Sequence, residues 1–393
     1  MAIPAELVCP KLRDGHHSSP ASSLAQAARI VCLLLLPFAL PAQIPPLQPP
    51  PLQVPSGSDV CAVGKTCAEL APQIIRSALG PSSLEENVRT LADSIGALPT
   101  GSAAARRAIR WAVDAFRRAG VDEVHTEKFS SPPGGSRAGT KGDRASSAAE
   151  SEYVVAEIRG REKPNDFVLL GAHLDSSGAG ASALGDASNA ALVIDAARVI
   201  HSSGSVPRRS IRFVLFTGSR DGLPGSWAYA RAHRAELDKM AAAIIFSAGD
   251  APVEGYSLGG RKDTLAAARE ALGPLRALDV REFTLDAGMD SESFDFLLEG
   301  VPTLTANVDT TNPATKDASS PQTLDEVKLS ALKRNVAVAA VTAYALADAE
   351  ECVGPRLNRA EIGQSLAETG LEQKMKRAGL WPSWESGDRG RQP

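Results

Sequence analysis

Apolar and polar residues alternate along the chain with a period that changes near residue 151. Before that point, apolar residues recur every three or four positions, which predicts amphipathic helices. A strand, VDEVHTEKF (121–129), follows them. The helical stretches are CAELAPQIIRSALG (67–80), SSLEENVRTLADSIGALP (82–99) and AAARRAIRWAVDAFRRAG (103–120).

From residue 151 to about residue 350, short apolar runs alternate with helical stretches. Near-continuous apolar strands with helices between them are typical of a parallel sheet covered on both faces. We therefore predict an α/β fold with a mostly parallel central sheet and helices on both faces. A long closing helix is expected over 327–350, and a helix is expected from Ala191. The predicted strands are YVVAEIRG, DFVLLGAH, IRFVLF, AAAIIF, REFTL and PTLTANV.

We interpret the N-terminal segment as a leader. Arg29 precedes the apolar run IVCLLLLPFAL (30–40), and the small residues of ALPAQ follow it, as in a secretory signal. The run is shorter than the roughly 20 residues that a membrane-spanning helix needs. We assign residues 1–42 to the leader and 43–57 to a proline-rich linker. The chain is then exported, periplasmic or secreted, with no membrane span after leader removal; an uncleaved leader that tethers it to a membrane is the alternative.

Two further segments stand apart from this pattern. Residues 130–150 are polar and of low complexity, which predicts a flexible loop. The tail, 351–393, has an amphipathic middle with Leu366, Leu371 and Met375. We expect this tail to pack on the body of the protein, with docking on a partner as the alternative.

Composition and charge narrow the classes of function. The chain of 393 residues is 43% hydrophobic and 22% charged, as in a globular protein. Its net charge of -4 and the lack of a basic patch exclude a nucleic-acid partner. Export would allow a disulfide, either Cys61–Cys67 or one of these two with Cys352, and the spacing fits no zinc finger.

The chemistry is expected where strands end, because ligands of open α/β sheets bind beyond the carboxyl ends of the strands. Three predicted strands end at His173, at TGSRDG (217–222) and at Ser247. The middle turn carries Ser219 and Arg220, where an α/β enzyme usually has acids. A serine nucleophile is disfavoured because GSRDG does not match the G-x-S-x-G turn.

The motifs at these strand ends resemble a known family. GAHLDS, ALGDASNAALVIDAARVI, IRFVLFTGSRDGLPGSWAYARAHR, AAAIIFSAG and GYSLGGRKD occur in this order. Together they resemble the zinc-dependent aminopeptidase and carboxypeptidase Q type of metallopeptidase, from about Ala68 to about Glu350. The resemblance implies a zinc-exopeptidase-like (phosphorylase/hydrolase-like) domain, with 58–150 as its N-terminal part and 151–350 as its core. Larger relatives carry a protease-associated domain where this chain has the loop 130–150.

The resemblance also implies a metal site and shows where this chain departs from it. Members of the family hold two zinc ions about 3.5–4 Å apart, which activate a bridging water. His173 matches the first ligand, and Asp175 matches the acid that orients it. The general-base position falls on Ser219. The other ligand positions fall on Gly185, Arg220, Ser247 and Lys316.

These replacements predict a protein without metal. A guanidinium stays protonated and cannot coordinate a cation. We expect Arg220 to pair with Asp175, Asp186 or Asp221 and to fill the former metal cavity. No cofactor is then expected, and the chain is interpreted as a catalytically inactive peptidase-like protein that binds a peptide or protein partner.

An active alternative stays open. Asp186, Asp221 and Asp250 each follow a lost acid closely, so a slipped site with His173 could bind zinc and hydrolyse peptide bonds. Three independent slips are needed, and each usually turns a side chain to another face. A decaying gene product is a third reading, which the intact patterning of the core strands opposes. The remaining histidines, among them His125, His201 and His233, have no acid at ligand spacing and are interpreted as surface residues.

Overall fold

The computed structural model describes most of the chain after residue 65. Predictions for the leader, the linker, Cys61, residues 131–149 and Lys316 therefore lie outside the described part, as does the side chain of Arg220. The described residues are 66–96, 98–121, 123–130, 150–176, 181–308 and 327–392.

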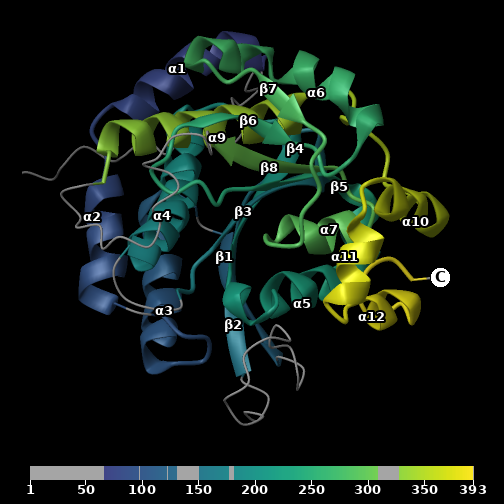
Figure 1. Cartoon of the computed structure of the whole chain (residues 1–393). Coiled ribbons are helices and arrows are strands. Elements are labelled where there is room, and N and C mark those ends of the chain that lie inside the picture. The colour runs from purple at the N-terminus through teal and green to yellow at the C-terminus, as the bar shows by residue number, and fades with distance from the viewer. Residues whose placement is uncertain are drawn as a thin grey trace, which may run out of the picture. The chain divides into compact units, whose positions relative to one another are not determined.

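The described strands form one sheet in the order β1-β2-β4-β3-β5-β8-β6-β7 (Figure 1). Its centre is parallel, as predicted, because β4, β3, β5 and β8 all run in the same direction. These strands bury runs of Val, Leu, Ile, Phe and Ala on both faces of the sheet. Their bounds are β3 (Lys163–His173), β4 (Arg209–Phe216), β5 (Met240–Ile245) and β8 (Thr303–Val308).

Both edges of the sheet contain antiparallel pairs. β1 (Glu123–Ser130) pairs with β2 (Glu150–Ile158), and β2 pairs with β4. At the other edge, β6 (Val253–Ser257) runs antiparallel to β8 and parallel to β7 (Glu282–Thr284). β6 was not predicted, since its five residues include a glycine. Gly255 is required there because a Cβ at this position would lie 1.8 Å from the carbonyl oxygen of Glu282.

Helices cover both faces of the sheet, which confirms the α/β prediction. One face carries α1 (Cys67–Leu79), α2 (Leu84–Arg89), α3 (Ala103–Arg118), α4 (Ala181–Ser202) and α9 (Leu329–Asp348). α9 is apolar nearly all round because it is buried along most of its length. α6 (Leu265–Ala271; Figure 1) contributes Ala268 to the same apolar cluster as α9. The other face carries α5 (Pro224–Ala232) and α7 (Ser293–Leu298).

The tail packs on the body, as predicted. It forms α10 (Arg359–Glu368), α11 (Leu371–Arg377) and α12 (Trp381–Glu385) beside α5 and α7 (Figure 1). Leu366, Leu371 and Met375 are fully buried. They join one apolar cluster with residues of the body, which are Leu223, Phe294 and Leu298.

An ion pair fixes the end of the tail to the body. Arg389 is 3% exposed and Asp295, on α7, is 2% exposed. The Arg389 guanidinium donates from Nε to Asp295 Oδ1 at 2.7 Å and from Nη2 to Oδ2 at 3.1 Å. Nη2 also donates to the carbonyl of Gly222 at 3.2 Å. The tail thus joins α7 to the turn that follows β4.

Two described cysteines bear on the predicted disulfide. Cys67 and Cys352 are both free, so these two do not form a disulfide. Burial raises the pKa of the Cys67 thiol to about 12, and its Sγ lies 3.8 Å from the carbonyl oxygen of Val341.

Within the part of the chain that the structure describes, no helix has the length and apolar character to cross a membrane.

Candidate functional site

The sheet brings the three predicted strand ends to one edge. β3 ends at His173, the turn Ser219–Asp221 follows β4, and Ser247 follows β5. β3 pairs in parallel with both β4 and β5, so the three carboxyl ends are neighbours. Gly185 lies on α4, which begins at Ala181 rather than at Ala191. The position expected for the bridging acid is therefore in the first turns of a helix.

Carboxylates surround the His173 ring. Nε2 lies 2.6 Å from Asp186 Oδ1, and Nδ1 lies 3.7 Å from Glu292 Oε1. The side chain of His173 is only 11% exposed. Asp175, the partner predicted for it, instead accepts the backbone N–H of Ser219 at 3.2 Å. The histidine is thus held from α4, and Asp175 fixes the turn after β4.

Glu292 is a site residue that the sequence did not reveal. It directly precedes α7 and is 1% exposed. Its Oε1 accepts a hydrogen bond from the Ser219 hydroxyl. Its Oε2 is buried and has no hydrogen-bond partner among the residues described. A buried carboxylate oxygen without a partner is costly, so this oxygen marks the point where the site could take up a donor.

The charges of this cluster shift two pKa values. Burial disfavours the charged imidazole, but the hydrogen bond to Asp186 and the charges of Glu292 and Asp186 outweigh it and raise the pKa of His173 to about 9. Burial raises the pKa of Asp175 to about 6, although His173 and the Ser219 N–H oppose that rise. At neutral pH the cluster is therefore an imidazolium held among carboxylates.

The residues present do not fit the two zinc ions that the resemblance implied. Gly185 has no side chain, Ser219 offers a neutral hydroxyl, and Ser247 is exposed. Over the described ranges, no group of three or more His, Cys, Asp or Glu side chains could hold a metal ion. The pairing predicted for Arg220 stays a prediction, because its side chain is not described.

The three acids of the alternative metal site, Asp186, Asp221 and Asp250, have different surroundings. Asp186 lies against His173, and Asp221 is exposed in its turn. Asp250 accepts the backbone N–H of Lys328 at 2.9 Å, just before α9. The serine nucleophile also gains no support, since the hydroxyl of Ser219 donates to a carboxylate rather than to a histidine.

A second polar cluster corrects the interpretation of His233 as a surface residue. His233 lies at the end of α5, is 16% exposed, and has Nε2 2.9 Å from Glu127 Oε2 on β1. Tyr153 on β2 donates to the same Oε2 at 2.7 Å, and His125 Nε2 lies 3.1 Å from Glu127 Oε1. His233 and Glu127 are 106 residues apart, so no spacing along the sequence could reveal the pair.

This cluster predicts a stability that depends on pH. Burial would raise the pKa of Glu127, but hydrogen bonds from His233 and Tyr153 lower it to about 2. Burial likewise opposes the charge of His233, but the hydrogen bond to Glu127 raises the His233 pKa above 6.5. The pair therefore stabilises the fold most between about pH 4.5 and 6.5. Its contribution is lost as the pH falls toward 2 or rises through the His233 pKa.

We expect His233→Gln to lower the free energy of unfolding by about 1 kcal/mol at about pH 5.5, since the pair is partly open to solvent. The difference from the unsubstituted chain should shrink by about pH 9.5. Urea unfolding at both pH values measures it, with His201→Gln, an exposed histidine on α4, as the control. A difference that is constant with pH would show that His233 acts through packing and not through charge.

Comparison with known sequences supports the resemblance. A model of peptidase family M28 matches residues 153–343. Carboxypeptidase Q of Rattus norvegicus is 29% identical over 202 residues, which are 51% of this chain and 43% of that protein. The human protein of the same name is 27% identical over the same length. Transferrin receptor protein 1 of Gallus gallus is 30% identical over 173 residues, 38% of this chain and 22% of that protein. The chain thus spans less than half the length of each of these relatives.

Solved structures show the same fold. The peptidase M28 precursor from Shewanella amazonensis SB2B has a TM-score of 0.65 at 19% identity, covering 74% of this chain and 99% of that chain. The zinc aminopeptidase BSAP from Bacillus subtilis has a TM-score of 0.54 at 12% identity, covering 74% and 98%. These relatives share the mixed sheet and its helical cover. The fold, the ordered motifs and the matched range together show that residues 153–343 of this chain form a peptidase family M28 domain.

Proposed function

We propose that this chain is a non-catalytic member of the family, which retains the peptidase scaffold and acts as a binding or interaction module for a peptide or protein partner. One observation carries the proposal. The residues at the ligand and base positions cannot supply metal chemistry, and the one retained histidine, His173, is engaged by Asp186 and lies near Glu292.

The loss of the base supports this reading. Ser219 stands at the general-base position, and its hydroxyl donates a hydrogen bond to Glu292. A hydroxyl in this state cannot take a proton from water, and the loss of a general base typically costs 10²–10⁴-fold in rate. Gly185 and Ser247 remove two carboxylates that would neutralise the metal ions. No single repair would therefore restore peptide hydrolysis.

A binding role is supported by the intact scaffold and by one relative. The buried strands and α9 retain a continuous apolar core. A chain without a selected role would be expected to accumulate polar residues in these strands. Among the sequence relatives, transferrin receptor protein 1 of Gallus gallus is named as a receptor and not as a peptidase. We also propose that the chain is exported, on the basis of the apolar run at 30–40.

Metal stoichiometry tests the proposal. The purified chain is equilibrated with micromolar zinc or manganese, free ion is removed by gel filtration, and bound metal is counted by mass spectrometry. We expect no stoichiometric metal and no release of N-terminal or C-terminal residues from test peptides. The zinc aminopeptidase of Bacillus subtilis, taken through the same steps, shows that the procedure preserves tightly bound zinc.

One feature favours an alternative. Asp175, Asp186 and Glu292 lie around His173, and Oε2 of Glu292 has no hydrogen-bond partner among the described residues. These carboxylates carry the negative charge that a cation would need. An altered metallo-exopeptidase could use them with zinc. One or two tightly held ions per chain, together with peptide hydrolysis, would establish this alternative and overturn the proposal.

A further inference from the structure

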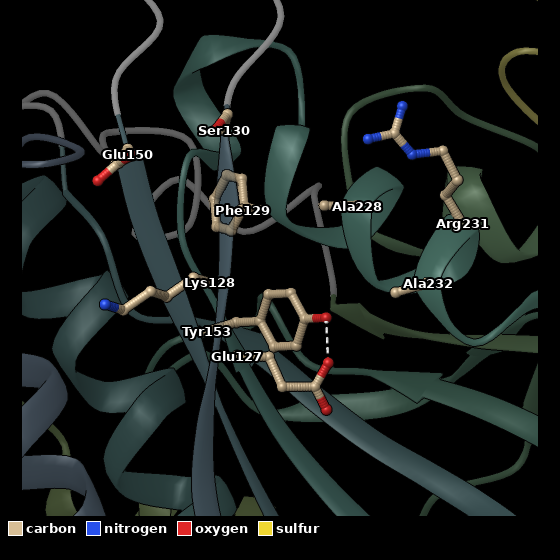
Figure 2. A pocket seen from close by; sticks show the side chains of 9 residues that line it. All are labelled: Glu127, Lys128, Phe129, Ser130, Glu150, Tyr153, Ala228, Arg231 and Ala232. Atoms are coloured by element: carbon tan, nitrogen blue, oxygen red, sulfur yellow. Dashed lines mark hydrogen bonds between the residues drawn. The ribbon is translucent and has the colours of Figure 1, made fainter.

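The end of the β1–β2 ribbon and α5 enclose a hollow of about 490 Å³ (Figure 2). β2 pairs with β4 only from Val154 to Ile158, while its first residues pair with β1 alone among the described strands. The ribbon therefore projects past the rest of the sheet at this end. Its face toward α5 carries Phe129 and Tyr153, whose rings lie 5.9 Å apart and nearly parallel.

Side-chain size explains why the hollow is not filled. α5 presents Ala228 and Ala232 toward the two rings, and neither is long enough to reach them (Figure 2). The contact between His233 and Glu127 holds the end of α5 against β1 and closes one side. The hollow is thus a wedge with an aromatic wall and a wall of small residues. Its volume lies within the roughly 300–1,000 Å³ typical of ligand pockets.

Two acidic and two basic residues line the wedge, namely Glu127, Glu150, Lys128 and Arg231. Arg231 is exposed on α5 beside the opening, and no ion pair joins it to another described residue. The carboxylate of Glu127 is already engaged by Tyr153, His233 and His125. Lys128 and Glu150 also line the hollow, and their side chains point away from Arg231 in Figure 2. The Arg231 guanidinium lies on the α5 side of the hollow beyond Ala228 (Figure 2), where it can pair with an anion at the opening.

β1 adds a backbone surface to this chemistry. It is the end strand in the order of the described sheet, so one side of it pairs with no described strand. An extended peptide can pair with such an edge while one of its side chains enters a neighbouring pocket. A C-terminal residue with an apolar side chain would place its carboxylate beside the cation.

We propose that this wedge binds an apolar or aromatic carboxylate, with the apolar group between Phe129 and the alanines of α5 and the carboxylate on Arg231. A free aromatic acid and the C-terminal residue of a peptide share this chemistry. The wedge shares no residue with the cluster around His173, so it goes beyond the proposed function and its failure would leave that proposal intact.

Calorimetric titration of the full chain tests the wedge with three probes, which are N-acetyl-phenylalanine, the peptide Ala-Val-Ala-Phe with a free carboxylate, and the same peptide as its C-terminal amide. We expect the acids to bind and the amide to bind at least about tenfold more weakly, because the amide has no charge to pair with the Arg231 guanidinium. Tighter binding of the peptide acid than of N-acetyl-phenylalanine would identify a peptide ligand that pairs with β1. Equal binding would identify a small acid.

Variants separate the wedge from general charge attraction. Arg231→Ala should weaken binding of the acids about tenfold or more, and Ala228→Trp should abolish it by filling the hollow. Lys374→Ala removes one positive charge from an exposed position on α11 that does not line the wedge, and it should leave binding unchanged. The proposal is overturned if none of the probes binds, if the amide binds as well as the acid, or if Lys374→Ala weakens binding as much as Arg231→Ala. Both charge variants are on the surface, so these outcomes do not depend on whether Ala228→Trp folds.

Discussion

A variant with acids restored at Gly185, Ser219, Arg220 and Ser247 is expected to retain zinc tightly, in contrast to the unsubstituted chain. The substitutions Gly185→Asp, Ser219→Glu, Arg220→Glu and Ser247→Asp return the carboxylates that the family resemblance places around His173. Position 185 can take a side chain, because a Cβ there would meet no atom within 4 Å. Replacing Arg220 also removes a cation that would repel the metal.

The expected gain in zinc affinity is at least about 10³-fold, since loss of even one outer partner of a metal ligand typically costs 10–100-fold. Competition with a chelating dye measures it. The matched control carries amides of the same size at the four positions, with Asn at 185 and 247 and Gln at 219 and 220. If the folded acid variant retained no more zinc than the amide variant, the assignment of these positions to the metal site would be wrong.

Substitution of Arg389 by methionine is expected to lower the free energy of unfolding by about 3–5 kcal/mol. The change would leave the Asp295 carboxylate buried without its bidentate partner. Burial already raises the pKa of Asp295, and the charge of Arg389 opposes that rise. Equilibrium unfolding in urea, followed by circular dichroism, measures the loss.

Two further variants test the cause of this loss. Arg377→Met removes a charge from an exposed position on α11 and should change the stability by less than about 0.5 kcal/mol. The double substitution Arg389→Met, Asp295→Leu should recover most of the loss, because a buried ion pair can often be replaced by apolar residues at little cost. A double variant as unstable as Arg389→Met would show that the arginine acts through its bond to the Gly222 carbonyl instead.

The sequence predicted the central sheet because its strands are buried on both faces and read as apolar runs. It failed at β6, where Gly255 and a length of five residues hide a strand whose place is fixed by β7 and β8. It also placed the start of α4 too late, since the small and polar residues before Ala191 have no helical apolar period. Packing against neighbouring elements, which no local pattern contains, decides both cases.

The candidate site could likewise be predicted from the sequence only in part. His173, Ser219 and Ser247 could be predicted to lie at one edge of the sheet, because each stands at the end of a predicted strand and parallel strands end at one edge. Glu292 was missed because its role depends on contact with Ser219, 73 residues earlier in the chain. Its signal was the acid-rich stretch DAGMDSES after the strand REFTL, a strand end that was not counted among the three.

The ion pair between Arg389 and Asp295 has a consequence for folding during synthesis. The two residues are 94 positions apart, and the tail that carries Arg389 lies beyond the range matched by the family model. Translation at about 5–20 residues per second would separate their emergence by about 5–20 s. During that interval the M28 domain is translated, but Asp295 on α7 lacks the guanidinium that pairs with it in the folded chain. The contacts that join α7 to the turn after β4 through Arg389 therefore form only after nearly the whole chain has been made.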